Sequence, residues 1–511
     1  MNGYIDATPT EIEAIVQSSW QAFTKYRKMN LKDRAGFLKA IANRLQNASE
    51  QIIKKAMEET NLEGPRLQVE LTRTIFQLES YAEACAEGAW LDIRINTANA
   101  QMAANGNNGP ATHIQMQSLS KVDLRKMMIP LGPVVVFGAS NFPFAYSTAG
   151  GDAACALAAG CTVIIKAHPA HAGTSEMVYQ LIREAASECK LPEGIFHHLH
   201  GASFEVGRAL VQHPLVKAIG FTGSFEGGKA LFDWANARAV PIPVFAEMSS
   251  VNPVFLLPQK LEEDKEKIAG MYAESVTQSV GQFCTNPGII AGIESPALTD
   301  FVRLLGEGIK NTRPAKMLHP GIAKSFYKKR ADVLQQPHVT IAAETAFDAA
   351  EDEAKPTVTI VDAQTFLSNP ILHKEIFGPY SIIVKCKNEE ELLEVAKHME
   401  GQLTATLMAT DDEVKENGEL VDVLKEISGR FIMNGVPTGV EVALGMQHGG
   451  PYPATTDSRF TAVGPDGIRR FARPISYQNW SNDLLPDELK NENPLKLWRT
   501  VNGELTNKGI E

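Results

Sequence analysis

Between residues 134 and 237 the chain alternates four short apolar segments with four segments of helical pattern. The apolar segments, such as VVVFGA and TVIIKA, carry no charge apart from Lys166 and Lys217. Strands that are apolar on both faces and separated by helices predict a parallel sheet covered by helices, and ligands bind beyond the carboxyl ends of such strands. The predicted strands are residues 134–139, 162–167, 196–199 and 216–221, and the predicted helices are residues 152–160, 174–186, 204–213 and 225–237.

A second alternating block begins at Val251 and predicts a second α/β domain. Before the first block, residues up to about Trp90 are helical, with apolar side chains at steps of three and four. After the second block, the tail from Asn482 is polar and only marginally helical. With 511 residues, the chain is long enough for two or three domains.

The composition excludes several classes of protein. A net charge of −11 disfavours nucleic acids and anionic membranes as partners, because both attract basic surfaces. Six cysteines without a C-x-x-C pair or a metal-ligand spacing indicate neither disulfides nor a metal site, and the N-terminus lacks a secretory signal, so we expect a cytoplasmic protein. Residues 131–165 contain one charge, but glycines and prolines divide them into pieces too short to cross a membrane.

The stretch GSFEGGKA (223–230) differs by one residue from a phosphate-binding P-loop. The P-loop requires Ser or Thr as a magnesium ligand where this chain has Ala230, so an NTP-dependent enzyme is disfavoured. A helix start after a strand can still hold a dinucleotide pyrophosphate on backbone N–H groups. A plain glycine-rich turn explains the stretch equally well.

Three polar residues near element ends are candidates for chemistry, each with a structural alternative. Cys284, in SVGQFCTNPG, follows a predicted helix and is either a reactive thiol or a small buried apolar residue. Asn141 follows a predicted strand, where its amide can stabilise an oxyanion or simply form a turn before Pro143. Glu247 ends an apolar strand and is either a partly desolvated general base or a solvated carboxylate.

Six motifs in register identify a family resemblance. They are PLGPVVVFGASNFP, VIIKAHPA, AIGFTGS, AEMSSVNP, GQFCTNPG and KEIFGP, in this order from Pro130 to Pro379. Together they resemble the aldehyde dehydrogenase superfamily, and the likeness extends to Trp480. It implies two doubly wound parallel-sheet domains with a small β oligomerisation flap and assembly into a homodimer or homotetramer. The implied ranges are a cofactor domain over 1–247, with 450–480 packing back onto it, a catalytic domain over 248–449, and a flap and tail at about 120–130 and 481–511.

The resemblance also implies roles for individual residues. Cys284 matches the nucleophile that forms a thiohemiacetal and then a thioester, Asn141 the oxyanion donor, and Glu247 the base that activates the hydrolytic water. No metal is required. The cofactor would be NADP or NAD, held by Lys166, Gly223, Ser224, Glu375 and Phe377.

Two positions depart from the family pattern. Members that prefer NAD commonly have a Glu two residues after the lysine, where this chain has His168, so the carboxylate that repels a 2′-phosphate is missing. With Lys166 and Arg208 as nearby cations, we expect NADP to be preferred over NAD. Glu247 is followed by Met248, Ser249 and Ser250 in place of Leu-Gly-Gly, which stiffens the turn after the base.

Within the superfamily, GQFCTNPG, GVPTGVEV and HGGPYPATTDSRFTAVG most closely resemble 2,5-dioxovalerate (α-ketoglutaric semialdehyde) dehydrogenases. The implied reaction is NAD(P)-dependent oxidation of the small aldehyde 2,5-dioxopentanoate to 2-oxoglutarate. A carboxylate on the substrate and product suggests a cation in the substrate tunnel, and Arg459 and His448 are the candidates. Phe283 would line the wall of this tunnel. The alternatives are an NADP-dependent dehydrogenase of longer or fatty aldehydes, and a non-catalytic binding protein on the same fold.

Overall fold

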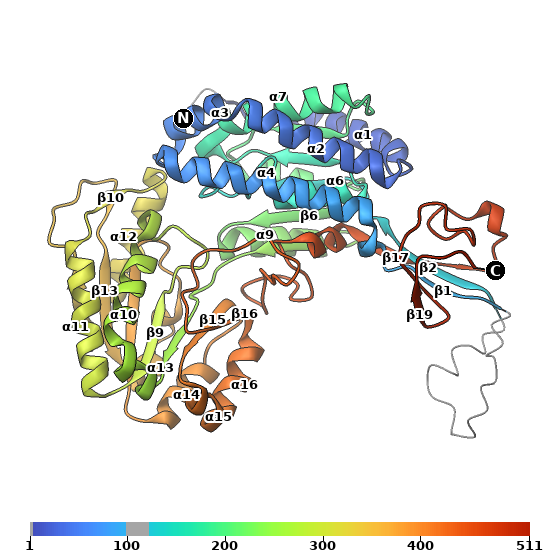
Figure 1. Cartoon of the computed structure of the whole chain (residues 1–511). Coiled ribbons are helices and arrows are strands. Elements are labelled where there is room, and N and C mark those ends of the chain that lie inside the picture. Colours follow the sequence, from blue (N-terminus) through green and yellow to red (C-terminus); the bar gives the residue numbers. More distant parts are fainter. Residues whose placement is uncertain (1–3, 99–121, 511) are drawn as a thin grey trace, which may run out of the picture.

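The computed structural model describes residues 4–98 and 122–510 of the chain. Figure 1 shows a helical layer over a first sheet, a second sheet with its own helices, and a thin flap that projects away from both. The amino-terminal layer consists of α1 (Pro9–Tyr26), α2 (Leu31–Asn47), α3 (Ser49–Thr60) and α4 (Gly64–Glu87).

The first sheet is parallel and has helices on both faces. Its strands are β3 (Val134–Phe137), β4 (Val163–Lys166), β5 (Phe196–Leu199), β6 (Ala218–Thr222) and β7 (Val244–Glu247), in the order β5-β4-β3-β6-β7. Alternate residues of a strand point to opposite faces. In β3, Val134 and Val136 therefore pack in a core with α2, α4, α6 (Gly151–Ala159) and α7 (Ala172–Glu188). Val135 and Phe137 pack in another with α1, α8 (Phe204–Gln212) and α9 (Phe225–Asn236).

The second sheet has seven strands, of which only β11 is antiparallel to its neighbour. The strands are β8 (Val254–Leu256), β9 (Ile289–Ile293), β11 (Thr340–Glu344), β13 (Thr357–Asp362), β14 (Tyr380–Cys386), β15 (Gln402–Met408) and β16 (Ser428–Met433), in the order β11-β13-β14-β9-β8-β15-β16. One face packs on α10 (Pro258–Thr277) and α11 (Pro296–Asn311). The other packs on α12 (Pro320–Leu334), α13 (Ala363–Ser368), α14 (Glu389–Lys397) and α16 (Gly418–Ile427). Two short elements, β10 (Ala315–Lys316) and β12 (Glu353–Ala354), pair separately, and α15 (Asp411–Glu416) precedes α16. The predicted α/β class with two parallel-sheet units is confirmed.

The flap is a five-stranded sheet built from distant parts of the chain. It contains β1 (Arg94–Asn96), β2 (Leu124–Pro130), β17 (Ala472–Gln478), β18 (Arg499–Val501) and β19 (Glu504–Thr506), in the order β17-β2-β1-β18-β19. The predicted start of the flap at residues 120 and 121 lies outside the described residues.

The tail after Asn482 forms strands, so the prediction of marginal helix was wrong. The tail shows no apolar periodicity in the sequence, because hydrogen bonds from a buried arginine, rather than an apolar face, hold it in place. The fully buried Arg499 donates to the carbonyl oxygens of Lys490 at 2.5 Å and Lys508 at 3.2 Å. A hydrogen-bonded guanidinium of this kind leaves no pattern in the neighbouring sequence.

Residues 450–480 divide between two parts of the molecule. The 3-10 helix Pro465–Phe471 packs on α6, whereas β17 leaves the core to pair with β2 in the flap. The domain ranges inferred from the sequence remain predictions. None of the helices in the described ranges combines the length and apolarity that crossing a bilayer requires.

A buried ion pair fastens the carboxy-terminal segment to α6. The guanidinium of Arg470 lies 2.6 Å from the carboxylate of Asp152, and both side chains are largely withdrawn from water. We expect Arg470→Met to lower the free energy of unfolding by about 3–5 kcal/mol, because it leaves a buried carboxylate unpaired. Urea unfolding measures this change.

The matched control is Arg469→Met, whose arginine is more exposed and pairs weakly with Asp466 at 3.7 Å. The control should change stability by less than about 0.5 kcal/mol. The double variant Asp152→Asn with Arg470→Met should recover part of the loss. Equal effects of the two single arginine variants would contradict a stabilising role for the buried pair.

Candidate active site

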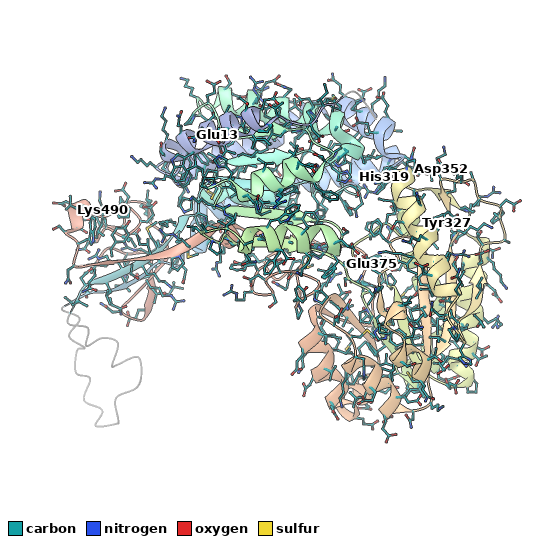
Figure 2. All side chains as sticks on the ribbon, turned by 180° about the vertical axis from the view of Figure 1, so that it is seen from behind. Glu13, His319, Tyr327, Asp352, Glu375 and Lys490 are labelled. Carbon is teal, nitrogen blue, oxygen red and sulfur yellow. The ribbon has the colours of Figure 1, made fainter. Side chains whose placement is uncertain are left out.

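The candidate site lies where the carboxyl edge of the first sheet meets the amino edge of the second. Asn141, Lys166, Ser224 and Glu247 end or follow strands of the first sheet, whereas Cys284 and Glu375 precede β9 and β14 of the second. Figure 2 shows Glu375 at the junction between the two bodies. The short link from β7 to β8 brings the two edges together, so residues remote in sequence converge here.

The nucleophile candidate is held in a strained loop. The three residues Ser279, Val280 and Gly281 all have φ between 49° and 61°, a region that costs a β-branched valine free energy. Gly281 is required for a second reason: a Cβ there would lie 2.3 Å from the carbonyl oxygen of Gly378. The strained backbone before Cys284 therefore packs directly against the segment that contains Glu375 and Gly378.

Asn252 fixes the other end of this loop. Its Nδ2 donates to the carbonyl oxygens of Cys284 and Asn286, both at 2.9 Å, while its Oδ1 accepts from Ser250 and Thr404. It is fully buried and has φ of 46°, which asparagine tolerates better than most residues. The segment that follows Glu247 is thus hydrogen-bonded through Asn252 to the loop that contains Cys284.

His448 stands between the thiol and the candidate base. Its Nε2 lies 3.7 Å from Cys284 Sγ and 3.2 Å from Glu247 Oε1. Both His448 and Glu247 are buried. The sequence suggested His448 as one of two candidate ligands of the substrate carboxylate, and the structure brings it to the thiol and the candidate base. A histidine between a thiol and a carboxylate can carry a proton from one to the other.

Burial and neighbouring charges determine which of Cys284 and Glu247 carries a proton. Burial first, and then the nearby Glu247 carboxylate, raise the pKa of the Cys284 thiol well above its ordinary value. For Glu247, burial acts to raise the pKa, but the charge and hydrogen bond of His448 outweigh it and the pKa falls. The resting thiol is therefore protonated beside an ionised carboxylate, and a base must remove its proton before it attacks a carbonyl.

Asn141 and the backbone of Cys284 offer hydrogen-bond donors to an oxyanion. One N–H of the Asn141 side chain donates to the carbonyl oxygen of Gln282 at 3.1 Å, which leaves its second N–H available. Arg66 donates to the Asn141 carbonyl oxygen at 2.7 Å and holds that backbone in place. Within the part of the chain that the structure describes, no hydrogen bond occupies the Cys284 N–H.

Lys166 is a half-buried amine at the carboxyl end of β4. Among the described residues it has neither an ion pair nor a hydrogen bond, and burial lowers its pKa, opposed by the charge of Asp6. His168 follows, with a pKa held well below its ordinary value by burial and then by the neighbouring His171 and Lys166. A half-buried cation without a partner beside a neutral imidazole suits a polar or anionic ligand.

Ser224 caps the start of α9, where its Oγ accepts from the Gly227 N–H at 3.2 Å. The helix start and Gly223 lie at the carboxyl edge of the first sheet, an arrangement that suits a pyrophosphate. Lys229, the lysine of the P-loop likeness, instead pairs with Asp233 at 2.7 Å.

Glu375 has a partner that the sequence did not suggest. The Ser249 hydroxyl donates to Glu375 Oε2 at 2.6 Å, so one of the residues that replaces a family glycine binds the carboxyl matched to the nicotinamide ribose. Burial first raises the pKa of Glu375 to about 7, although Ser249 and Lys329 lower it. Phe377 lines a small hollow with Glu375 and Phe283. This donor set fits a nicotinamide cofactor.

The remaining predicted residues have different environments. Phe283 packs against Phe142 at 5.7 Å between ring centroids and is half-buried next to the nucleophile. Arg459 is exposed, pairs with Asp457 at 2.5 Å and contacts no residue of the cluster. Arg208 is exposed on α8.

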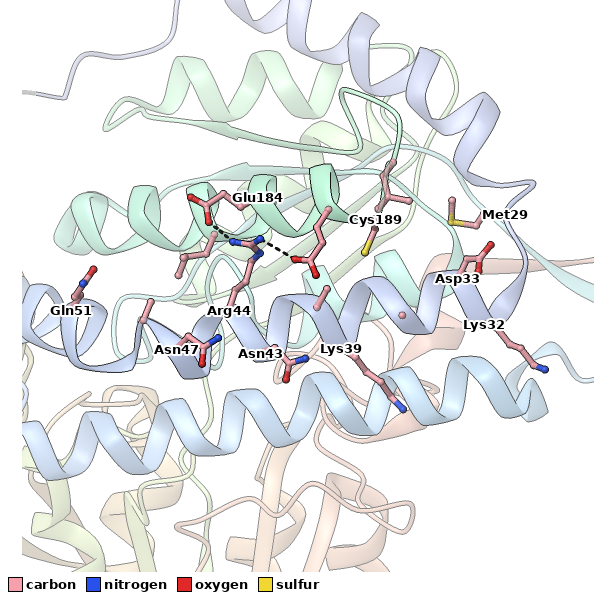
Figure 3. Close-up of a pocket in the computed structure, with 16 residues that line it drawn as sticks. Met29, Lys32, Asp33, Lys39, Asn43, Arg44, Asn47, Gln51, Glu184 and Cys189 are labelled. Atoms are coloured by element: carbon pink, nitrogen blue, oxygen red, sulfur yellow. Dashed lines mark hydrogen bonds and ion pairs between the residues drawn. The ribbon is translucent and has the colours of Figure 1, made fainter.

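A separate cavity of about 800 Å³ lies between α2 and α7 and contains none of these residues. Arg44 of α2 pairs across it with Glu184 at 2.5 Å and with Glu188 at 2.9 Å. Figure 3 shows Arg44 beside Glu184. No chemistry of the candidate site involves this cavity.

A thiol, an imidazole and a carboxylate in contact are the groups that a cysteine-dependent enzyme uses. The family model described as "Aldehyde dehydrogenase family" matches residues 2–451. An alpha-ketoglutaric semialdehyde dehydrogenase of Acinetobacter baylyi is 43% identical over 507 residues, 99% of this chain and 93% of that protein. Alpha-ketoglutaric semialdehyde dehydrogenase 2 of Azospirillum brasilense is 43% identical over 498 residues, 98% of this chain and 92% of that protein.

Solved structures with low sequence identity to this chain support its fold. A 1-pyrroline-5-carboxylate dehydrogenase matches with a TM-score of 0.74 at 20% identity, over 93% of this chain and 86% of that chain. A betaine aldehyde dehydrogenase of Staphylococcus aureus in complex with NAD+ matches with a TM-score of 0.76 at 17% identity, over 93% and 90%. The chain belongs to the aldehyde dehydrogenase family and is an NAD(P)-dependent aldehyde dehydrogenase.

The raised pKa of Glu375 predicts a pH-dependent stability. Because about 7 lies above the value of 4.5 for a free glutamate, the folded chain binds this proton more tightly than the unfolded chain. Stability should therefore fall as pH rises from about 4.5 through 7. In Glu375→Gln this contribution is absent, so the stability of the variant relative to the native chain should grow by up to about 3 kcal/mol over that range.

Denaturant unfolding of both chains at intervals from pH 4.5 to 8 measures the difference. The exposed Glu400 provides the control, since Glu400→Gln should run parallel to the native chain throughout. A parallel curve for Glu375→Gln would show that the carboxyl is already ionised in the folded chain at low pH.

Proposed function

We propose that the chain oxidises 2,5-dioxopentanoate to 2-oxoglutarate through a thioester on Cys284. The observation that supports the chemistry is the single cluster in which His448 contacts both Cys284 and Glu247. The substrate is proposed from the two relatives that are 43% identical over nearly the whole chain.

In the first half-reaction the thiol proton passes to His448, with Glu247 stabilising the imidazolium that forms. The sulfur then bonds to the aldehyde carbon. The second side-chain N–H of Asn141 and the backbone N–H of Cys284 stabilise the resulting oxyanion, because neither donates a hydrogen bond to another described residue. When the oxyanion collapses, the carbon gives up a hydride and a thioester remains on Cys284. A nicotinamide bound at this site would be the hydride acceptor.

In the second half-reaction Glu247 removes a proton from water, which attacks the thioester carbon. The carbon–sulfur bond breaks, the carboxylic acid leaves, and the cysteine sulfur takes back the proton held by His448, while the proton on Glu247 is released to water. The depressed pKa of Glu247 keeps it ionised and able to accept that proton at neutral pH.

We propose NADP as the preferred cofactor over NAD. Lys166 and His168 would lie at the adenosine end, Gly223 and Ser224 at the pyrophosphate, and Glu375 and Phe377 at the nicotinamide ribose. The residue at 168 is a neutral imidazole, which does not repel a 2′-phosphate as a carboxylate does. Arg208, exposed on α8, is the further cation proposed for the 2′-phosphate. The carboxylate of Asp6 accepts from the N–H groups of Ala202 and Ser203, which compensates its charge.

We also propose that the flap forms the contact of a homodimer or homotetramer. Trp480, Trp498 and Leu505 lie in the flap region with half or more of their surface exposed. Apolar residues of this size on a projecting sheet are typical of subunit contacts.

The first experiment is reduced-nicotinamide formation with 2,5-dioxopentanoate, for NADP and NAD separately. We expect turnover with the native chain, a larger kcat/KM with NADP, and none with Cys284→Ala. Cys189 is half-buried like Cys284 but lines the separate cavity, so Cys189→Ala is the control and should be fully active.

No turnover by a folded, reduced sample would reject the semialdehyde, and activity that increases with aldehyde chain length would support the fatty-aldehyde alternative. A larger kcat/KM with NAD would reject the proposed cofactor preference without affecting the reaction class.

His448→Gln should lower kcat/KM about 10- to 100-fold, since the thiol loses the base that contacts it. The loss should shrink as pH rises, because hydroxide then ionises the thiol without the imidazole. His398→Gln, at an exposed position of the surface, is the matched control. A pH-independent loss would assign His448 a structural role.

A further inference from the structure

Two arginines from distant elements converge on one loop beside the nucleophile. Arg430, on β16, donates to the carbonyl oxygens of Gly439 at 2.8 Å and Pro437 at 2.5 Å. Arg73, on α4, donates to the carbonyl oxygen of Val440 at 3.3 Å. This segment, residues 435–442, is the GVPTGVEV stretch that carries part of the likeness to semialdehyde dehydrogenases.

Contacts connect Arg73 to the catalytic cluster. Its Nη2 donates to the Tyr146 hydroxyl at 3.3 Å and its guanidinium lies 5.4 Å from the centre of that ring. The Tyr146 ring lies 6.2 Å from His448, which contacts Cys284 at 3.7 Å.

Arg430 also acts on the cluster. Its positive charge favours the thiolate of Cys284 and interacts with Tyr146. Its neighbour Gly429 packs so closely on Gly449 that an added Cβ would meet the Gly449 carbonyl oxygen, so β16 lies directly against the segment that holds His448.

Neither arginine has a carboxylate partner among the described residues. Nearby arginines do: Arg66 pairs with Glu70 and Arg470 with Asp152. Arg73 and Arg430 are half-buried and donate only to neutral oxygens, and Arg430 Nε is buried with no hydrogen bond at all. A withdrawn guanidinium without a counter-ion favours an anionic ligand, and its planar fork matches a carboxylate.

We propose that Arg73 and Arg430 bind the carboxylate of the substrate while Cys284 attacks the aldehyde at its other end. The inference rests on the proposed function, since it requires an aldehyde that carries a carboxylate. It replaces Arg459, whose guanidinium is exposed and already paired with Asp457. Phe142, Tyr146 and Phe283, whose rings pack in series at 5.3 Å and 5.7 Å, would contact the carbon chain between the two ends.

The test compares three aldehydes of five carbons: 2,5-dioxopentanoate, 5-oxopentanoate and uncharged pentanal. For Arg430→Met and for Arg73→Met we expect kcat/KM with the two carboxylates to fall about 30-fold or more, mainly through KM, as for a lost charge-assisted pair. With pentanal, kcat/KM of Arg73→Met should change by less than about 3-fold. Arg430→Met should lose clearly less activity with pentanal than with the carboxylates, since only the loss of the thiolate-favouring charge affects all three aldehydes. Arg459→Met is the matched control and should leave all three substrates unchanged.

The alternative is that both arginines only hold the loop in place. In that case the methionine variants would lose activity equally with all three aldehydes, and this outcome would overturn the inference. Arg430→Lys and Arg73→Lys cover the case in which a methionine variant does not fold: they keep the charge but not the fork, so partial retention of the preference for carboxylates is expected, and full loss of activity with pentanal would again indicate a structural role.

The native chain separates the inference from the proposed function. If it prefers 5-oxopentanoate to pentanal but does not oxidise 2,5-dioxopentanoate, the proposed substrate is rejected and the arginine subsite is supported. If the native chain shows no preference for carboxylates, the subsite is rejected, whatever its activity with 2,5-dioxopentanoate.

Discussion

A thiol that burial keeps protonated needs a base within reach, and the architecture of this enzyme places one there. Cys284 is supplied by the second sheet and Glu247 by the first, while His448 comes from a segment that follows the last strand of the second sheet. Each is fixed by its own element: Glu247 by β7, Cys284 by the strained loop and Asn252, His448 by the Thr461 hydroxyl that its N–H reaches at 3.0 Å. The junction between the sheets is therefore the only place where these groups meet.

Much of the fold was predictable because burial on both faces leaves a pattern in the sequence. The predicted strand at 196–199 coincides with β5, and the predicted helix at 225–237 ends one residue beyond α9. The flap was only partly predictable. Its strands β1, β18 and β19 are three residues long, too short for an alternation to be read, and the buried Arg499 that orders the tail resembles any surface arginine in the sequence.

Some residues of the candidate site could likewise be predicted from the sequence and others could not. Cys284, Asn141 and Glu247 stand at element ends within recognisable motifs, so the sequence singled them out. Arg73 and Arg430 lie inside a helix and a strand, where an arginine is ordinary, and only the fold brings them to one loop. Ser249 was expected to stiffen a turn, but its hydroxyl binds Glu375 across the junction. A contact between residues 126 positions apart leaves no local signal in a single sequence.

The charges around Cys284 oppose one another, and this has a consequence for the order of events. Glu247 and Glu375 raise the pKa of the thiol, whereas Arg430 lowers it. A substrate carboxylate bound as proposed on Arg430 would offset the positive charge that favours the thiolate, so binding would make ionisation of Cys284 harder. Under the proposed mechanism the proton would leave through His448 as the carbon–sulfur bond forms, when the developing oxyanion gains the donors of Asn141 and the Cys284 N–H. The base and the oxyanion donors would therefore act together, because a thiolate formed before binding would lose the support of Arg430 when the substrate arrives.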